Sequence, residues 1–170
     1  MKVQTINYKK EYQIINDSEV ILETRKPKWY SSEINFCYNN KHYEINKSGF
    51  WSSSRTVLEL ERPIGKIDWS SLKGGAIRLK NKNDTYSEYT LKKENVGKWY
   101  TSERRYVLNK KDLSPVLTIH YDVNWLAVED ISVSFNDEPS PDFVLLVCCL
   151  FLMRQQLSDE NSANHSLGNL

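Results

Sequence analysis

Lysines and arginines are concentrated in the middle of this 170-residue chain, where residues 73–111 hold 11 of them against 4 acidic residues. Residues 1–72 carry a net charge of +2 and residues 112–170 one of −8, so the charge is unevenly spread. Alternate residues of a strand project from one face. Arg78, Lys80 and Lys82 alternate in the sequence, so on a strand and its turn they would project together. We expect an anion-binding surface whose candidate residues are Arg78, Lys80, Lys82, Arg104, Arg105, Lys110 and Lys111.

The chemistry of such a surface is electrostatic, and anionic phospholipid headgroups are a suitable ligand. Near a charged membrane each well-placed cation contributes about 1 kcal/mol. Nucleic acid is disfavoured as a partner because the whole chain carries a net charge of only +1. Two alternatives stay open. The basic segment could meet a protein partner or the acidic C-terminal part of the same chain, or it could be a solvated face whose lysines prevent strands from pairing edge to edge.

Residues that could do covalent chemistry are few. His120 and Asp122 share a strand face, but the chain has no Gly-x-Ser-x-Gly nucleophile motif, and two solvated polar residues are the simpler interpretation. Glu129 and Asp130 are adjacent, so on a strand they point to opposite faces, and we interpret them as a solvated strand start. The sequence therefore predicts a protein that is not an enzyme, with no catalytic residues and no cofactor.

The three cysteines, Cys37, Cys148 and Cys149, show neither a disulfide framework nor the CxxC spacing of a metal site. Neighbouring residues on a helix point about 100° apart, so a bond between the last two would be strained. We interpret the cysteines as buried free thiols that pack as small hydrophobic side chains. Free thiols are typical of a reducing compartment, so we expect a cytoplasmic protein, peripheral to a membrane if the basic surface binds lipid.

The fold that positions these residues can be predicted from residues 143–153. They are eleven consecutive apolar residues in a chain of mean hydropathy −0.61. A helix of this length covers only about 16 Å, too short for the roughly 30 Å hydrocarbon core of a bilayer, so we do not expect a transmembrane protein. A helix that is apolar on every side must instead be surrounded by protein. Its expected buried core is Phe143, Leu146, Cys148, Leu150 and Phe151.

The punctuation around this run favours a helix over about 141–156. Ser140 is a suitable N-cap, Pro141 suits the first helical position, and Asp142 places a negative charge at the positive end of the helix. A buried strand is the alternative, but eleven residues are long for a strand, and Leu, Cys and Met dilute the β-branched content.

Upstream of residue 140 the sequence predicts strands at intervals of about 8–12 residues, with turn residues between them. Ten to twelve strands and one fully apolar helix predict a mainly β fold, a closed antiparallel barrel of about 12 strands wrapped around the buried C-terminal helix. Residues 1–157 would form this one domain and residues 158–170 a flexible tail. The inward wall would include Ile34, Phe36, Ile77, Leu79, Ile119, Tyr121, Ile131 and Val133.

This order of elements resembles the tubby C-terminal-like superfamily, in particular the small LURP-one-related proteins and the bacterial scramblase-like proteins. The matching features are the hairpins 12–24 and 34–45, the strand pair 76–91 and the closing PDFVLLVCCLFLMRQQ, which together cover about residues 3–157. The resemblance implies a twelve-stranded barrel threaded by a C-terminal apolar helix. The calcium-binding loop of the scramblases and the long basic signature of animal tubby proteins have no counterpart in the sequence, so the resemblance implies neither activity.

The function predicted from these observations is a non-enzymatic binding or scaffold domain that recognises anionic headgroups or a protein partner through its basic outer face. The alternative is an enzyme or small-ligand carrier with a site at a barrel mouth. An open cavity inside the barrel would favour the carrier, whereas a barrel filled by the helix would favour the binding domain.

Overall fold

The computed structural model describes residues 1–6, 11–28, 33–49, 53–70, 74–81, 83–95, 103–112, 114–123, 128–136 and 142–167. Its strands are β1 (Lys2–Thr5), β2 (Tyr12–Asn16), β3 (Glu19–Arg25), β4 (Ile34–Tyr38), β5 (Lys41–Lys47), β6 (Arg55–Glu59), β7 (Arg62–Ser70), β8 (Gly74–Lys80), β9 (Tyr86–Asn95), β10 (Arg104–Lys110), β11 (Pro115–Val123) and β12 (Glu129–Phe135). The helix α1 (Phe143–Leu167) follows them.

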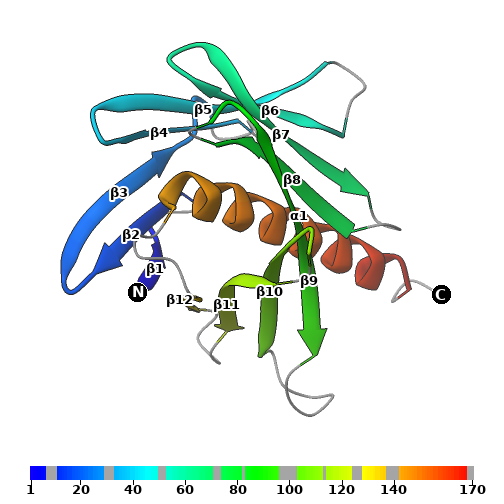
Figure 1. The fold of residues 1–170 in the computed structure, drawn as a ribbon. Helices are drawn as coiled ribbons and strands as arrows, with labels where there is room; N and C mark the ends of the chain where they lie inside the picture. The colour runs from blue at the N-terminus through cyan, green and yellow to red at the C-terminus, as the bar shows by residue number, and fades with distance from the viewer. Residues whose placement is uncertain are drawn as a thin grey trace.

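The 12 strands of the described residues form one closed antiparallel barrel, which confirms the predicted fold class. Each strand pairs with its neighbours in the sequence, and β1 closes the ring by pairing with β12 as well as β2. Closure removes the free edges that an open sheet would expose. Figure 1 shows α1 running through the barrel with strands on both sides of it.

Three of the hairpins turn on two residues that both have positive φ, as type I′ turns require. These pairs are Asp17 and Ser18, Asn39 and Asn40, and Leu60 and Glu61. The first two lie within the hairpins 12–24 and 34–45 that the sequence predicts, and Asn and Asp tolerate left-handed backbone. The turn at Leu60 carries no such signal. Pro63 and Gly65, residue types that are common in turns, both lie within β7 instead.

The core lies between α1 and the inner faces of the strands. Every residue from 145 to 153 is at most 4% exposed, so the helix is buried on all sides, as its composition predicts. The predicted core residues Phe143, Leu146, Cys148, Leu150 and Phe151 are all buried, and so are all the predicted wall residues named above. The helix approaches β8 so closely that a Cβ at Gly75 would lie 2.8 Å from the Leu152 side chain.

The start of α1 differs from the prediction. Asp142 is the N-cap, because its Oδ1 accepts a hydrogen bond of 3.0 Å from the Leu145 N–H and its carbonyl accepts one from Leu146. Ser140 and Pro141, to which the sequence assigned the cap and the first helical position, lie outside the described residues.

The helix continues past its predicted end near residue 156 and runs to Leu167. Two residues of the expected tail contact the barrel. Asp159 accepts a hydrogen bond of 2.7 Å from the Trp69 indole, and Glu160 forms ion pairs with Lys93 and Arg104. Mobility of the last residues stays a prediction. Among the described residues, no helix combines the length and the apolar character needed to cross a bilayer.

Candidate functional site

The outer surface of β8 to β10 carries part of the predicted basic surface. Arg78 and Lys80 alternate with the buried residues of β8, Arg105 alternates with those of β10, and Lys111 lies in the turn that follows β10. We call these four residues the outer basic face. Their side chains are exposed by 57%, 35%, 44% and 80%, respectively.

The remaining predicted residues do not belong to this face. Arg104 and Lys110 lie on β10 in the same alternation as Tyr106 and Leu108, which are fully buried inside the barrel. Arg104 is half-buried at one end of the barrel, where it pairs with Glu160, and its guanidinium lies 6.0 Å from the Tyr121 ring centroid. The structure therefore places Arg104 and Lys110 apart from the outer basic face, and their part in anion binding stays a prediction. Lys82 lies outside the described residues.

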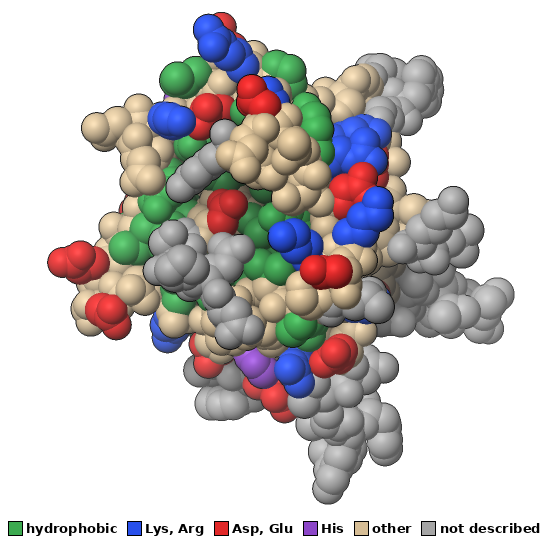
Figure 2. Space-filling model, in the orientation of Figure 1, with side chains coloured by type: hydrophobic (Ala, Val, Ile, Leu, Met, Phe, Trp, Pro, Cys, Tyr) green, Lys and Arg blue, Asp and Glu red, His purple; other side chains and the backbone are tan. Residues whose placement is uncertain are grey.

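Each residue of the outer basic face has an acidic partner. The cross-strand registers Arg78–Glu88 and Arg105–Glu94 place opposite charges side by side, at 2.7 and 3.5 Å. Lys80 pairs with Asp84 at 2.8 Å, and Lys111 reaches the second oxygen of Glu88 at 3.5 Å. Basic and acidic side chains also lie interspersed over the face of the molecule in Figure 2. The surface is thus a mosaic of charges, in which Glu88 is shared by two cations.

The carboxylates of these ion pairs make the stability of the fold depend on pH in the acidic range. The charge of Lys111 and the hydrogen bond from Arg78 lower the pKa of Glu88, and hydrogen bonds from Lys41 and Tyr43 lower that of Glu59. A lowered folded-state pKa stabilises the fold above the unfolded value, about 4.3 for Glu, and this stabilisation is lost as the pH falls through the folded value. We therefore expect the melting temperature to fall between about pH 5 and pH 3.

The measurement is a series of thermal melts across this pH range. A Glu59→Gln variant, which cannot titrate at this position, is expected to show a shallower fall than the unmodified protein. A melting temperature that stays constant down to pH 3 would contradict the predicted role of these carboxylates.

A second group of polar side chains fills one end of the barrel, where α1 passes β1, β2 and β12. Both guanidinium NH groups of Arg154 donate to the two carboxylate oxygens of Glu129, and Arg154 Nε donates to the Tyr12 hydroxyl. The Thr5 and Tyr121 hydroxyls also donate to Glu129, at 2.7 and 3.3 Å. The interpretation of Glu129 as a solvated strand start is therefore wrong, because its side chain is only 17% exposed.

The electrostatics of this group are those of a structural ion pair. Burial alone would lower the pKa of the Arg154 guanidinium, but hydrogen bonds and charge interactions with Glu129 and Tyr12 outweigh it and raise the pKa. Burial raises the pKa of the Tyr12 hydroxyl, which therefore stays neutral. These groups bind one another, so they link α1 to β2 and β12 at this end of the barrel.

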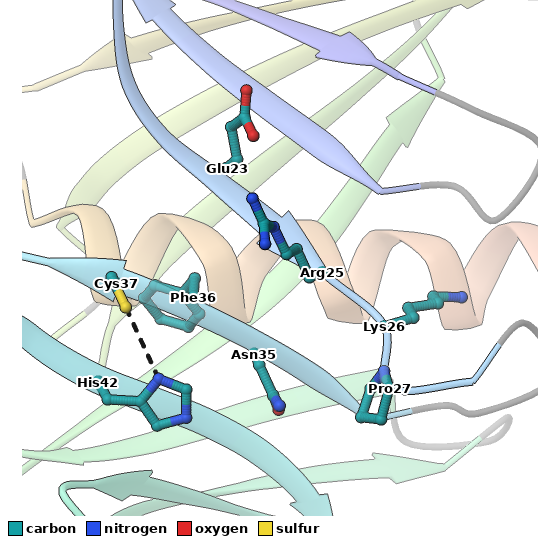
Figure 3. Close-up of a pocket in the computed structure, with 8 residues that line it drawn as sticks. All are labelled: Glu23, Arg25, Lys26, Pro27, Asn35, Phe36, Cys37 and His42. Atoms are coloured by element: carbon teal, nitrogen blue, oxygen red, sulfur yellow. Dashed lines mark hydrogen bonds between the residues drawn. The ribbon is translucent and has the colours of Figure 1, made fainter.

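A third site lies on the outer surface of β3, β4 and β5, beside a pocket of about 580 Å³ (Figure 3). Cys37 and His42 are opposite each other across the β4–β5 hairpin, and the Cys37 Sγ lies 3.7 Å from His42 Nδ1. The other ring nitrogen, Nε2, lies 3.1 Å from Glu44 Oε1. Asn46 donates to the second Glu44 oxygen at 2.7 Å, which fixes the carboxylate. The pocket lining includes Glu23, Arg25, Lys26, Asn35, Cys37 and His42.

The sequence interpretation missed this site because it treated all three cysteines as buried. Cys148 and Cys149 are fully buried, but Cys37 is exposed. The signal was present in the strand alternation, because the inward positions Ile34 and Phe36 require Cys37 to point outward. The two-residue turn at Asn39 and Asn40 then places residue 42 opposite residue 37.

Comparisons with protein-family models, curated proteins and solved structures give no significant match to the chain. The resemblance to the tubby C-terminal-like superfamily therefore stays a prediction. Within the described part of the chain, no three His, Cys, Asp or Glu side chains are grouped so that they could hold a metal ion.

Proposed function

We propose that the protein is a non-enzymatic binding domain that recognises anionic phospholipid headgroups through the outer basic face. The observation that carries this proposal is the arrangement around Glu88, where the exposed side chains of Arg78 and Lys111 share a single carboxylate. Two cations around one carboxylate leave a positive charge that a phosphate group can approach.

The ion pairs of this face do not oppose such binding strongly. Exposed pairs contribute about 0–1 kcal/mol each, so a lysine or arginine can leave its carboxylate for a lipid phosphate at little cost. The Glu88–Arg78 and Glu94–Arg105 pairs also hold the two arginines, on β8 and β10, beside the glutamates of the intervening strand β9.

The interior of the barrel supports a binding site on the outside. Residues 145–153 of α1 occupy the space between the strands, and the Arg154–Glu129 group fills one mouth. A small-ligand carrier needs an enclosed apolar cavity, and the burial of α1 between the strands favours a binding domain over a carrier.

The test is co-sedimentation with liposomes. The protein is expected to bind vesicles of phosphatidylcholine and phosphatidylserine at low salt and not to bind vesicles of phosphatidylcholine alone. Binding should weaken towards physiological salt, because exposed charges are then screened over about 8 Å. The double substitution Arg78→Glu and Lys111→Glu is expected to abolish binding while the melting temperature changes little.

Two controls separate the outer basic face from net charge. The double substitution Lys41→Glu and Lys47→Glu on β5 makes the same charge change elsewhere on the barrel and should weaken binding much less. Arg104→Gln should leave binding unchanged, since this side chain lies at the barrel end. Equal binding to both kinds of vesicle at low salt would contradict the lipid proposal and favour a protein partner.

A further inference from the structure

The Cys37 thiol combines three features that the other two cysteines lack. It is exposed, it contacts an imidazole nitrogen, and it borders a pocket. By contrast, burial raises the pKa of the Cys148 and Cys149 thiols, which disfavours the reactive thiolate. Any thiol chemistry of the folded protein is therefore directed to Cys37.

The neighbours of Cys37 form a chain that suits proton transfer. His42 Nδ1 is within hydrogen-bond distance of the thiol, and Glu44 holds the opposite ring nitrogen at 3.1 Å. A carboxylate at Nε2 favours a proton there, which leaves Nδ1 free to accept the thiol proton, and it stabilises the imidazolium that results.

The pocket beside the thiol indicates the class of reactant. Its volume of about 580 Å³ falls within the roughly 300–1,000 Å³ typical of small-molecule sites. Two cations, Arg25 and Lys26, line it together with one carboxylate, Glu23. The net charge of this lining is positive, which suits a ligand with carboxylate groups. Asn35 also lines it, and its buried Oδ1 has no hydrogen-bond partner among the described residues.

We propose that Cys37 is a site of reversible S-thiolation by a low-molecular-weight disulfide that carries carboxylate groups, a class to which oxidised glutathione belongs. His42 accepts the thiol proton, and the Cys37 thiolate attacks one sulfur of the disulfide. The sulfur–sulfur bond of the reagent breaks as the new bond to Cys37 forms. The leaving thiolate takes the proton from His42, so the protein thiol is oxidised to a mixed disulfide and half of the reagent is reduced to a thiol.

The experiment incubates the full-length protein at neutral pH with oxidised glutathione and, in parallel, with the uncharged hydroxyethyl disulfide, and follows the adduct by intact-mass spectrometry. One glutathionyl group is expected, mapped to Cys37, formed faster than the hydroxyethyl adduct and removed by dithiothreitol. A Cys37→Ser variant should form no adduct.

Two substitutions test the roles of the neighbours. His42→Asn is expected to slow both reactions about tenfold, because it removes the proton acceptor. His120→Asn, at an exposed histidine on β11, is the matched control and should change neither rate. Arg25→Gln should remove the preference for glutathione and leave the rate with hydroxyethyl disulfide unchanged.

The proposal is overturned if His42→Asn reacts as fast as the unmodified protein, or if the two disulfides react equally fast with the unmodified protein. It is also overturned if the Cys37→Ser variant forms the same adduct. Circular dichroism of each variant establishes that these rates belong to the folded protein.

Discussion

A Cys148→Asp variant is expected to be unfolded at 25 °C. Cys148 is fully buried at the centre of α1, within the run of residues that are at most 4% exposed. Burial raises the pKa of its thiol well above the ordinary value, so this position strongly disfavours a negative charge. An unpaired buried carboxylate costs several kcal/mol, comparable to the 5–15 kcal/mol that stabilises a typical domain.

The measurement is far-UV circular dichroism with urea unfolding, and two variants serve as controls. Cys148→Ala removes a small apolar side chain without adding charge and should keep the fold. Ser158→Asp adds the same charge to an exposed position of the same helix and should change the melting temperature little. A Cys148→Asp protein with an unchanged melting temperature would mean that the helix is not enclosed on this side.

The second large effect concerns the ion pair between the helix and the barrel. An Arg154→Met substitution is expected to lower the free energy of unfolding by about 3–5 kcal/mol, because it leaves the Glu129 carboxylate buried without its counter-ion. The side chains of Arg154 and Glu129 are only 12% and 17% exposed, so water can solvate the unpaired carboxylate only weakly. Adding Glu129→Gln to Arg154→Met should restore part of the loss, since the remaining side chain is uncharged.

Urea unfolding of the two single variants and the double variant gives the coupling energy between these residues. The pair Lys93–Glu160 is a matched comparison, because it also joins the barrel to α1 but is exposed by 28% and 32%. Lys93→Met should therefore cost no more than about 1 kcal/mol. Additive effects in the Arg154 cycle would show that the two side chains do not stabilise each other.

Those parts of the fold that depend on local signals could be predicted from the sequence. The apolar run of α1 requires burial on all sides, and hairpins at Asn39 and Asp17 carry residues that tolerate positive φ. The turn at Leu60 and Glu61 could not be predicted locally. There the pairing of β6 with β7 determines where the chain reverses, and two residues of poor turn propensity adopt the required backbone.

The candidate sites depend on distant partners, which a single sequence does not reveal. Arg154 and Glu129 lie 25 residues apart, and only the passage of α1 along β12 brings them together. The basic segment could be recognised in the sequence, but the strand register determines which of its residues point outward and which lie at the barrel end. That register places Arg78 and Arg105 outside, beside Glu88 and Glu94, and Arg104 at the barrel end.

The order of parts along the chain also has a consequence for synthesis on the ribosome. The inner faces of the strands pack against a helix that follows all of them, and β1 completes its pairing only with β12. A nascent chain therefore exposes the apolar faces of its hairpins until residues 143–153 have emerged, at roughly 5–20 residues per second. A ribosome stalled after β12 would hold strands whose apolar inner faces have no helix to cover them.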